Sequence, residues 1–409
     1  MWEAIARNRR KSFVLISVMG AFMIGAGMLI AEAIWPGAYM AGGVVAIVLW
    51  AILSLTSFYG GDTVFLASAG ARKIQKNDHP TLYNIVEEMC IAAGISKMPK
   101  IYIIDDNRPN AFAVGRDPEH ASVAVTAGLL NRLNRDEVQG VVAHELAHIR
   151  NRDTLYVMVA AIMVGVIALM ADVFLRYAWL TGGRHRSRRG KGGNQAQAVL
   201  LIIAILFAIL GPIAVQLLYF ALSRRREYLA DACGALFTRY PEGLASALQK
   251  ISANPGLKEK KNRVMSPMYI VNPLQTAAFA AGGLGSTHPP TKDRIRILRS
   301  MAGASLADYE AAFARSTNQS VVPKSALETS RAVGIRPPWR DEKHKKPEPD
   351  ARQKARQTAD LLWKLNKYVF IACACGTRLK LPPSFKLSKV TCPRCGRVHD
   401  VPRGAQAKA

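Results

Sequence analysis

Long uncharged runs of hydrophobic residues dominate the first half of the sequence. A helix needs about 20 such residues to cross the hydrocarbon core of a bilayer. Four runs are long enough or nearly so, at residues 12–31, 33–61, 154–171 and 192–223. The pattern therefore predicts an integral membrane protein with about four transmembrane helices.

The first run is followed by Ala31-Glu32-Ala33, which resembles the cleavage site of a secretory signal peptide. The run is longer than the apolar region of a typical signal peptide, however, and a second run follows almost at once. A retained hairpin of two spans over residues 1–59 is the better interpretation. The basic residues before the first run predict a cytoplasmic N-terminus, which would make residues 60–153 a cytoplasmic domain.

The third and fourth runs form a second hydrophobic hairpin, at residues 154–221. The loop between them holds six basic residues between positions 176 and 191. The positive-inside rule would keep such a loop in the cytoplasm, which conflicts with two complete crossings. Either the basic loop is translocated or the hairpin enters the membrane only partly. In both cases the segments before and after the hairpin end on the same side.

A short motif precedes the third run: His144-Glu145-Leu146-Ala147-His148. On a helix the two histidines lie one turn apart on one face, where both can bind one Zn²⁺, and the glutamate can act as general base on zinc-bound water. Asn134 and Glu137 have the spacing of a capping box and predict the start of this helix. A solvated histidine pair is the alternative interpretation. It is disfavoured because the rest of the helix is largely apolar.

A third zinc ligand is expected after the fourth run, where Glu227 and Asp231 are four residues apart and share one helix face. One carboxylate can bind the metal while the other accepts a hydrogen bond from a ligand imidazole. The alternative is an ordinary charged helix flank. The residues alone do not say which carboxylate would bind.

The H-E-L-A-H motif, the later S-R-R-R-E-Y-L-A-D sequence and the four-run layout together resemble the HtpX-type membrane zinc endopeptidases, relatives of the CaaX prenyl proteases. Segments 83–153 and 286–290 are also similar to that family. The resemblance implies an α+β fold with a zincin (gluzincin)-like catalytic domain, assembled from residues 60–153 and 222–315. It implies His144, His148 and Glu227 as zinc ligands, Glu145 as base, and Asp231 as the partner of a ligand imidazole.

Residues 110–114 and 122–126 are short, β-prone segments joined by a turn, and they predict a strand pair. A strand edge above the zinc site can hold an extended peptide through main-chain hydrogen bonds. The predicted substrate-binding residues are Asn110, Ala111, Phe112 and Ala113.

The oxyanion formed during hydrolysis needs stabilisation beyond the metal. His288 is the candidate catalytic residue, with Arg294 as a further substrate-binding residue. The resemblance implies an equivalent histidine and arginine at the substrate. The alternative for His288 is a helix N-terminal residue before Pro289-Pro290.

The C-terminal region differs in character. Residues 316–367 are predicted to be a proline-rich linker and a short basic helix, and residues 368–402 a small metal-binding module. Its two cysteine pairs have the spacing of a Cys₄ zinc ribbon, although the first pair encloses one residue and not the usual two. A redox dithiol is the alternative. The predicted structural ligands are Cys373, Cys375, Cys392 and Cys395.

The net charge of +26 results from 55 Lys and Arg against 29 Asp and Glu. The basic tail could contact phosphates, anionic lipid or a protein partner. Aromatic residues for base stacking are sparse in it, which argues against nucleic-acid binding. Cysteines that look like metal ligands and not like disulfides favour a reducing compartment, so the soluble parts should face the cytoplasm.

Together these features predict a multi-pass zinc endopeptidase of the cell (inner) membrane, with one catalytic and one structural zinc ion. The resemblance implies quality control of misfolded membrane proteins and a stress-response role, with unfolded or extended polypeptides as substrates. One alternative is a CaaX-type processing protease, for which four spans are few. The other is a non-catalytic zinc-binding scaffold, which would have no need for Glu145. Nothing in the sequence indicates an oligomeric state.

Overall fold

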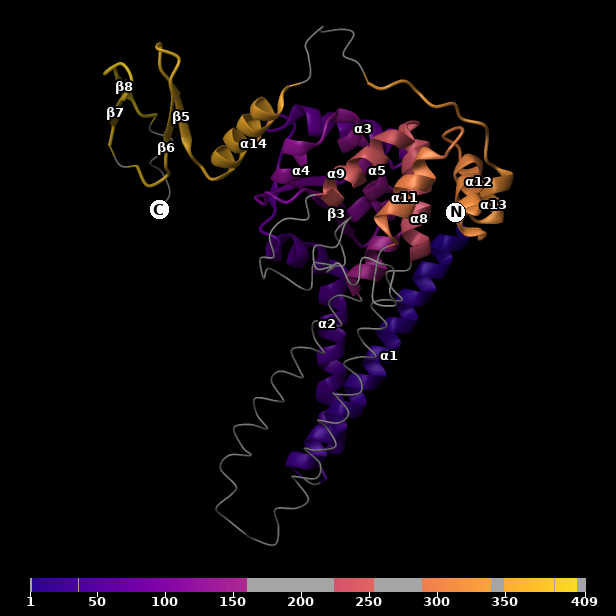
Figure 1. Cartoon of the computed structure of the whole chain (residues 1–409). Helices are drawn as coiled ribbons and strands as arrows, with labels where there is room; N and C mark the ends of the chain where they lie inside the picture. The colour runs from indigo at the N-terminus through magenta and orange to yellow at the C-terminus, as the bar shows by residue number, and fades with distance from the viewer. Residues whose placement is uncertain are drawn as a thin grey trace.

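The computed structural model of the 409-residue chain contains a helical hairpin, a mixed α/β domain and a C-terminal extension (Figure 1). The residues that the structure describes are 2–35, 37–159, 224–253, 289–339, 349–385 and 387–402.

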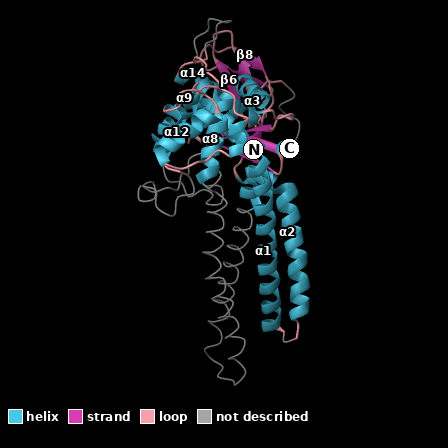
Figure 2. Cartoon of the chain, turned by 90° about the vertical axis from the view of Figure 1, so that its right-hand side faces the viewer, coloured by secondary structure: helices cyan, strands magenta, loops and turns pink. Residues whose placement is uncertain are grey.

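The helical hairpin consists of α1 (Trp2–Ile34) and α2 (Tyr39–Ser68), which lie side by side and project away from the α/β domain (Figures 1 and 2). By length and composition, Ser12–Leu29 and Tyr39–Ser68 can each cross a membrane. The two helices approach closely at Gly42, where a Cβ atom would lie 2.3 Å from the carbonyl oxygen of Gly27. Small residues at such a crossing let helix backbones pack tightly within lipid.

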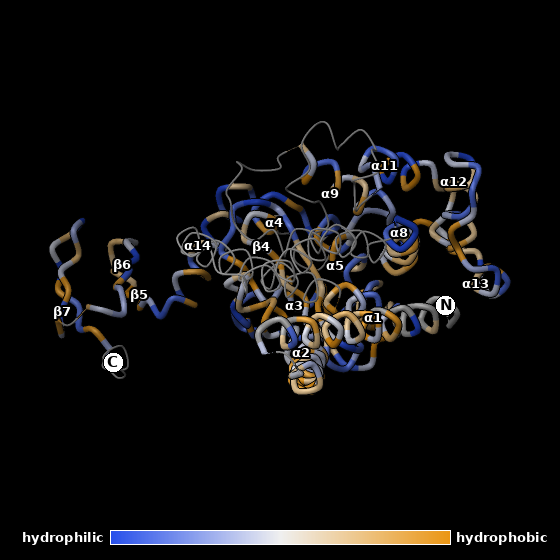
Figure 3. Tube along the Cα trace, turned by 90° about the horizontal axis from the view of Figure 1, so that it is seen from below, coloured by the Kyte–Doolittle hydropathy of each residue, from blue (hydrophilic) through white to orange (hydrophobic). Residues whose placement is uncertain are grey.

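The surface of this hairpin is hydrophobic, as the orange tube of α2 shows in Figure 3. Many of its large apolar side chains are exposed, among them Val44, Ile52 and Leu55. These two helices correspond to the first two of the four predicted spans. The third run begins as a helix at residues 153–159. The rest of it, the basic loop and the fourth run lie outside the described residues.

A four-stranded sheet lies at the domain end of α2, with the order β1-β2-β4-β3. β2 and β4 are parallel, whereas β3 and β4 form the antiparallel pair that the sequence predicts, with Ala113 opposite Val123. In this sheet β3 is an edge strand. The strands are β1 (Arg72–Lys73), β2 (Lys100–Ile104), β3 (Ala111–Gly115) and β4 (Ala121–Thr126).

Every residue of β3 and β4 is buried, because both faces of the sheet are covered. One face, with Ala113 and Val123, belongs to the main helical core. On the other face Phe112 packs in a cluster with Phe65 near the end of α2 and Met158 at the start of the third run. The membrane-proximal segments therefore form part of the catalytic fold.

The helical layer is built around α5 (Arg135–Arg150), which packs against its neighbours α3, α8 and α9. The predicted capping box is present, since Asn134 and Glu137 exchange hydrogen bonds at its start. Gly140 allows close contact with α9, because a Cβ atom there would lie 2.6 Å from the backbone nitrogen of Leu244. The other helices of this layer are α3 (Pro80–Ala93), α4 (Ala127–Arg132), α8 (Arg224–Thr238), α9 (Pro241–Ala253), α11 (Thr291–Arg299) and α12 (Leu306–Thr317).

The described parts of the C-terminal extension contact the α/β domain at several points. After α13 (Lys324–Glu328) the chain runs across the start of α5, where the Arg336 guanidinium lies 2.6 Å from carboxylate and amide oxygens of Asp136 and Gln139. The predicted basic helix is α14 (Ala351–Leu365), whose Leu361 is buried in the main core. In its described part, the predicted linker therefore packs against the α/β domain.

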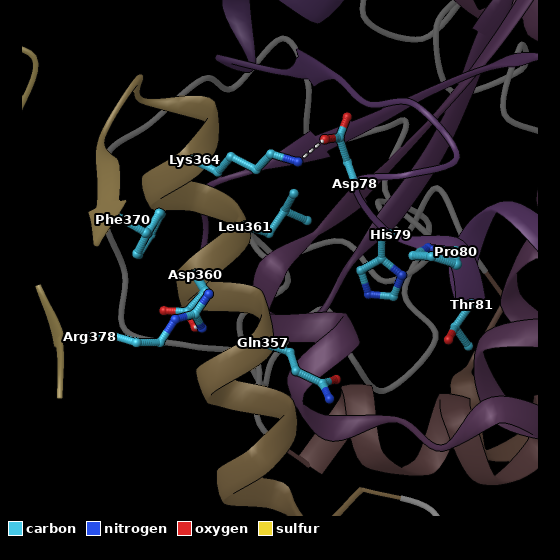
Figure 4. Close-up of a pocket in the computed structure, with 10 residues that line it drawn as sticks. All are labelled: Asp78, His79, Pro80, Thr81, Gln357, Asp360, Leu361, Lys364, Phe370 and Arg378. Carbon is cyan, nitrogen blue, oxygen red and sulfur yellow. Dashed lines mark hydrogen bonds and ion pairs between the residues drawn. The ribbon is translucent and has the colours of Figure 1, made fainter. Parts of the chain in front are cut away.

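A groove of about 430 Å³ separates α14 from the start of α3 (Figure 4). At one end the Lys364 ammonium lies 3.0 Å from a carboxylate oxygen of Asp78. Beyond α14, the small C-terminal module is formed by two antiparallel hairpins. They are β5 (Val369–Ala372) with β6 (Arg378–Leu381), and β7 (Lys389–Thr391) with β8 (Val398–Asp400).

Candidate metal centre

The side chains of His144 and His148 on α5 and of Glu227 on α8 converge in the interior of the domain. The two Nε2 atoms are 3.3 Å apart, and each lies 3.6 Å from a carboxylate oxygen of Glu227. A tetrahedral zinc ion with ligand bonds of about 2.1 Å separates its ligand atoms by about 3.4 Å. Each of the two carboxylate oxygens of Glu227 faces one imidazole, and one ligand atom from each of the three side chains lies within 4.8 Å of the other two. The three side chains can therefore hold one zinc ion, with a fourth position left for water or substrate.

Helix geometry explains the convergence. The two imidazoles lie one turn apart on α5, with their ring planes at 89° and their centroids 4.8 Å apart. Helix α8 approaches this face at Gly234, where a Cβ atom would lie 3.4 Å from the backbone nitrogen of His144. This close approach of the two helices brings Glu227 to the histidine pair.

The imidazole of His144 is oriented by Asp231, whose carboxylate lies 3.0 Å from Nδ1. With Nδ1–H donating to Asp231, the Nε2 lone pair is free for a metal. Arg294 binds Asp231 through two hydrogen bonds of 2.7 and 2.8 Å, and all three side chains are buried. Burial alone would raise the pKa of Asp231, but Arg294 and His144 hold it below its usual value.

His148 has a corresponding partner that sequence reasoning missed. Its Nδ1 lies 3.0 Å from a carboxylate oxygen of Asp153, which follows the end of α5. One signal was present in the sequence, because an acidic residue directly precedes an uncharged run of membrane length. Charged groups at such places are costly unless they are paired.

Negative charge around His144 favours a cation at its Nε2. Burial would lower the pKa of His144, but hydrogen bonds to Asp231 and Glu227 outweigh it and raise that pKa to about 9. A divalent metal ion can replace the proton, since the same carboxylates stabilise either positive charge.

Glu145 projects from the same helix toward the edge strand β3 and is buried. Burial raises the pKa of its carboxyl, while the neighbouring His144 and His148 lower it, as does a hydrogen bond with the backbone of Ala113. A buried carboxylate beside a metal position and a strand edge is suited to accept a proton from water.

The predicted substrate strand places its backbone groups in two directions. The carbonyl of Asn110 accepts the backbone N–H of Thr126 on the β4 side, and alternation then directs the groups of Ala111 and Ala113 toward the free edge. Phe112 turns its side chain into the apolar cluster under the sheet. The N–H of Ala111 donates to Oδ1 of Asn110 at 3.1 Å, so the carbonyl groups of Ala111 and Ala113 are the backbone groups that this alternation offers to a peptide.

Two further residues, His288 and Arg294, were predicted to lie near the substrate. His288 lies outside the described residues. Arg294 is buried, donates two hydrogen bonds to Asp231 and lies 3.8 Å from Glu227, which places it beside the proposed metal ligands. Its assignment to the substrate site stays a prediction.

The four C-terminal cysteines also converge. Sγ of Cys373 lies 3.3 Å from that of Cys395, and Sγ of Cys375 lies 3.7 Å from that of Cys392. All four sulfur atoms lie within 4.8 Å of one another. Zinc–thiolate bonds of about 2.3 Å imply sulfur separations of about 3.8 Å, so one tetrahedral ion is compatible with this cluster.

Comparison with known proteins gives a consistent result. The model of peptidase family M48 matches residues 76–302. A curated HtpX protease homologue from Dictyoglomus thermophilum is 43% identical over 73% of this chain and 94% of its own length. A Lactobacillus acidophilus HtpX homologue is 39% identical over 74% of this chain and 100% of its length. The crystal structure of S. mikatae Ste24p aligns with a TM-score of 0.40 and 15% identity, covering 73% of this chain and 67% of that one.

Proposed function

The chain belongs to peptidase family M48 and is an HtpX-type membrane metalloprotease, and we propose that it cleaves peptide bonds at zinc held by His144, His148 and Glu227. The observation that carries this assignment is the triangle of ligand atoms, one from each side chain, that lie within 4.8 Å of one another. Its buried position and the Asp231 partner of His144 support a preorganised site.

In the proposed mechanism the bound zinc supplies Lewis-acid activation of the scissile carbonyl and of the attacking water. Glu145 accepts a proton from that water and delivers it to the departing amine. Burial raises the pKa of the Glu145 carboxyl, whereas the Ala113 backbone lowers it, as expected for a carboxylate that lies next to β3. Asp231 keeps the His144 imidazole in its metal-binding orientation.

We propose that substrates bind as an added strand along the free edge of β3, through backbone groups of Ala111 and Ala113. Such main-chain recognition gives little sequence selectivity, which suits unfolded or extended segments of membrane proteins. We propose a role in membrane-protein quality control, because main-chain recognition suits unfolded segments of many different sequences.

The proposed orientation is multi-pass in the cell membrane, with the catalytic site on the cytoplasmic side. α1 begins and α2 ends at the α/β domain, so the hairpin returns the chain to the side on which it starts (Figure 1). Arg7, Arg9, Arg10 and Lys11 lie in the domain-proximal part of α1, which supports a cytoplasmic location.

We further propose that the C-terminal module binds a second, structural zinc ion through its four cysteines. The module has a small apolar cluster, formed around Cys373, Leu379 and Cys392. So small a core stabilises a fold weakly, and a metal ion would supply the missing folding free energy.

Zinc-dependent hydrolysis tests the main proposal directly. The full-length protein in detergent is expected to cleave casein, to lose activity with a chelator, and to regain it when Zn²⁺ is restored. The measurement is the rate of fragment release before chelation, after it and after metal addition. Cleavage that persists in protein shown to be free of metal would rule out the proposed chemistry.

The strand-pairing model predicts sensitivity to backbone methylation of the substrate. A peptide N-methylated near the cut site cannot donate the hydrogen bonds that an added strand requires, so its kcat/KM should fall by about tenfold or more for the loss of one or two such bonds. The control is the same peptide N-methylated several residues further from the scissile bond. Equal cleavage of both peptides would contradict binding along β3.

A further inference from the structure

His148, the second proposed zinc ligand, has its own set of orienting residues, which no sequence motif predicted. We infer that Asp153 and Arg226 form a chain that orients His148, and that this chain joins the metal site to the third hydrophobic segment. The inference rests on the zinc site proposed above. It concerns two residues on either side of a long hydrophobic insertion, which the fold brings together at the metal.

The contacts run in a line from the ligand outward. Nδ1 of His148 lies 3.0 Å from Oδ2 of Asp153. The other oxygen of Asp153 lies 4.0 Å from the guanidinium of Arg226, which is stacked 5.5 Å from the ring centroid of Tyr156. Asp153 is only 3% exposed and Arg226 only 7%, so solvent screens these charges weakly.

A closer version of this arrangement occurs at the first ligand, where Arg294 makes two hydrogen bonds of 2.7 and 2.8 Å to Asp231, whereas Arg226 lies 4.0 Å from Asp153. His144 binds Asp231, and Asp231 binds Arg294. Each imidazole of the proposed zinc site therefore donates Nδ1–H to a buried carboxylate, and each carboxylate has an arginine beside it. A carboxylate partner fixes the tautomer and ring orientation of a metal-binding histidine. The arginine offsets the cost of burying that carboxylate.

Sequence position gives the second chain an additional role. Asp153 is the first residue of the helical segment 153–159 that begins the third hydrophobic run, and Arg226 lies in the first turn of α8, next to Glu227. Two opposite charges, one after the end of the H-E-x-x-H helix and one at the start of the helix that carries the third ligand, therefore face each other at 4.0 Å across the insertion.

The segment that carries Asp153 is packed against the membrane hairpin and the substrate strand. The hydroxyl of Thr154 donates a 2.8 Å hydrogen bond to the carbonyl of Gly115, at the end of β3. Met158 fills the space over Gly61 of α2, where a Cβ atom would lie 2.8 Å from its sulfur. The orientation of His148 therefore depends on how residues 153–159 pack against α2 and β3.

The test is the metal affinity of the full-length protein in detergent, measured for Asp153→Asn. Co²⁺ is the probe, because thiolate charge-transfer bands identify the cysteine site and allow the histidine–carboxylate site to be followed separately. Competition with a chelator should show affinity at the latter site about 10- to 100-fold weaker than in the wild type. Arg226→Gln should weaken it in the same direction but less.

The matched control is Asp136→Asn, which removes another aspartate–arginine contact, the partly buried one with Arg336 at the opposite end of α5. It should leave Co²⁺ affinity at the histidine site unchanged. Wild-type affinity in both Asp153→Asn and Arg226→Gln would overturn the inference. If Asp153→Asn fails to fold, Arg226→Gln alone decides the matter by the same titration.

A Glu227→Ala variant distinguishes failure of this inference from failure of the proposed zinc site. If Glu227→Ala does not weaken Co²⁺ binding at the histidine site, the proposed zinc site itself is wrong. If Glu227→Ala abolishes that binding while Asp153→Asn and Arg226→Gln leave it intact, only the positioning chain is wrong.

Discussion

A Glu145→Gln variant is expected to lose peptide hydrolysis and to retain its zinc. Glutamine has nearly the same shape and can keep a hydrogen bond with the backbone of Ala113, but its amide cannot take a proton from water. Loss of a general base typically lowers the rate by about 10²- to 10⁴-fold. Casein cleavage and zinc content, measured on the same preparation, check both parts of the expectation.

The control for this experiment is Glu119→Gln, since Glu119 is an exposed carboxylate in the turn between β3 and β4. It should keep both zinc and activity. Cleavage by Glu145→Gln at the wild-type rate would exclude the proposed general base. Loss of zinc together with activity would mean that Glu145 holds the site together and would leave no support for a separate role in proton transfer.

Local spacing was sufficient to predict the helical part of the site. The four-residue separation of His144 and His148, and the capping box at Asn134, define the start and the metal-binding face of α5 from sequence alone. The same spacing at Glu227 and Asp231 predicts two carboxylates on one face but cannot distinguish their roles. The structure separates them, because Glu227 faces both Nε2 atoms whereas Asp231 lies behind His144.

Contacts between distant segments could not be predicted in this way. Asp153 and Arg226 are far apart in the sequence and meet only because α5 and α8 pack together. Arg294 was assigned to the substrate site through the resemblance, and its two hydrogen bonds with buried Asp231 could not be predicted from spacing. Charge patterns along a sequence do not reveal which arginines the fold will bury.

The C-terminal extension illustrates the same limit. Its prolines and alternating charges indicated a linker, followed by a short basic helix, and α14 is a helix at Ala351–Leu365. Its attachment depends on pairs such as Arg336 with Asp136 and Lys364 with Asp78, each separated by 200 residues or more. An anchored extension holds the cysteine module at a defined place on the catalytic domain, which a free linker would not do.

Replacing Glu227 with alanine should have the largest effect on the metal. Wild-type protein is expected to hold about two zinc ions per chain, and Glu227→Ala about one, because three protein ligands are the usual minimum for a catalytic zinc site. Peptide hydrolysis should be lost together with the zinc ion of the histidine–glutamate site.

Cys392→Ser should also reduce the zinc content to about one ion per chain, but by emptying the cysteine site. The Co²⁺ spectra of the two variants should therefore be complementary. Glu242→Ala, which removes an exposed partner of Arg299, should retain both ions and full cleavage. An unchanged zinc content with unchanged cleavage in Glu227→Ala would mean that the triangle of buried ligand atoms is not the catalytic site.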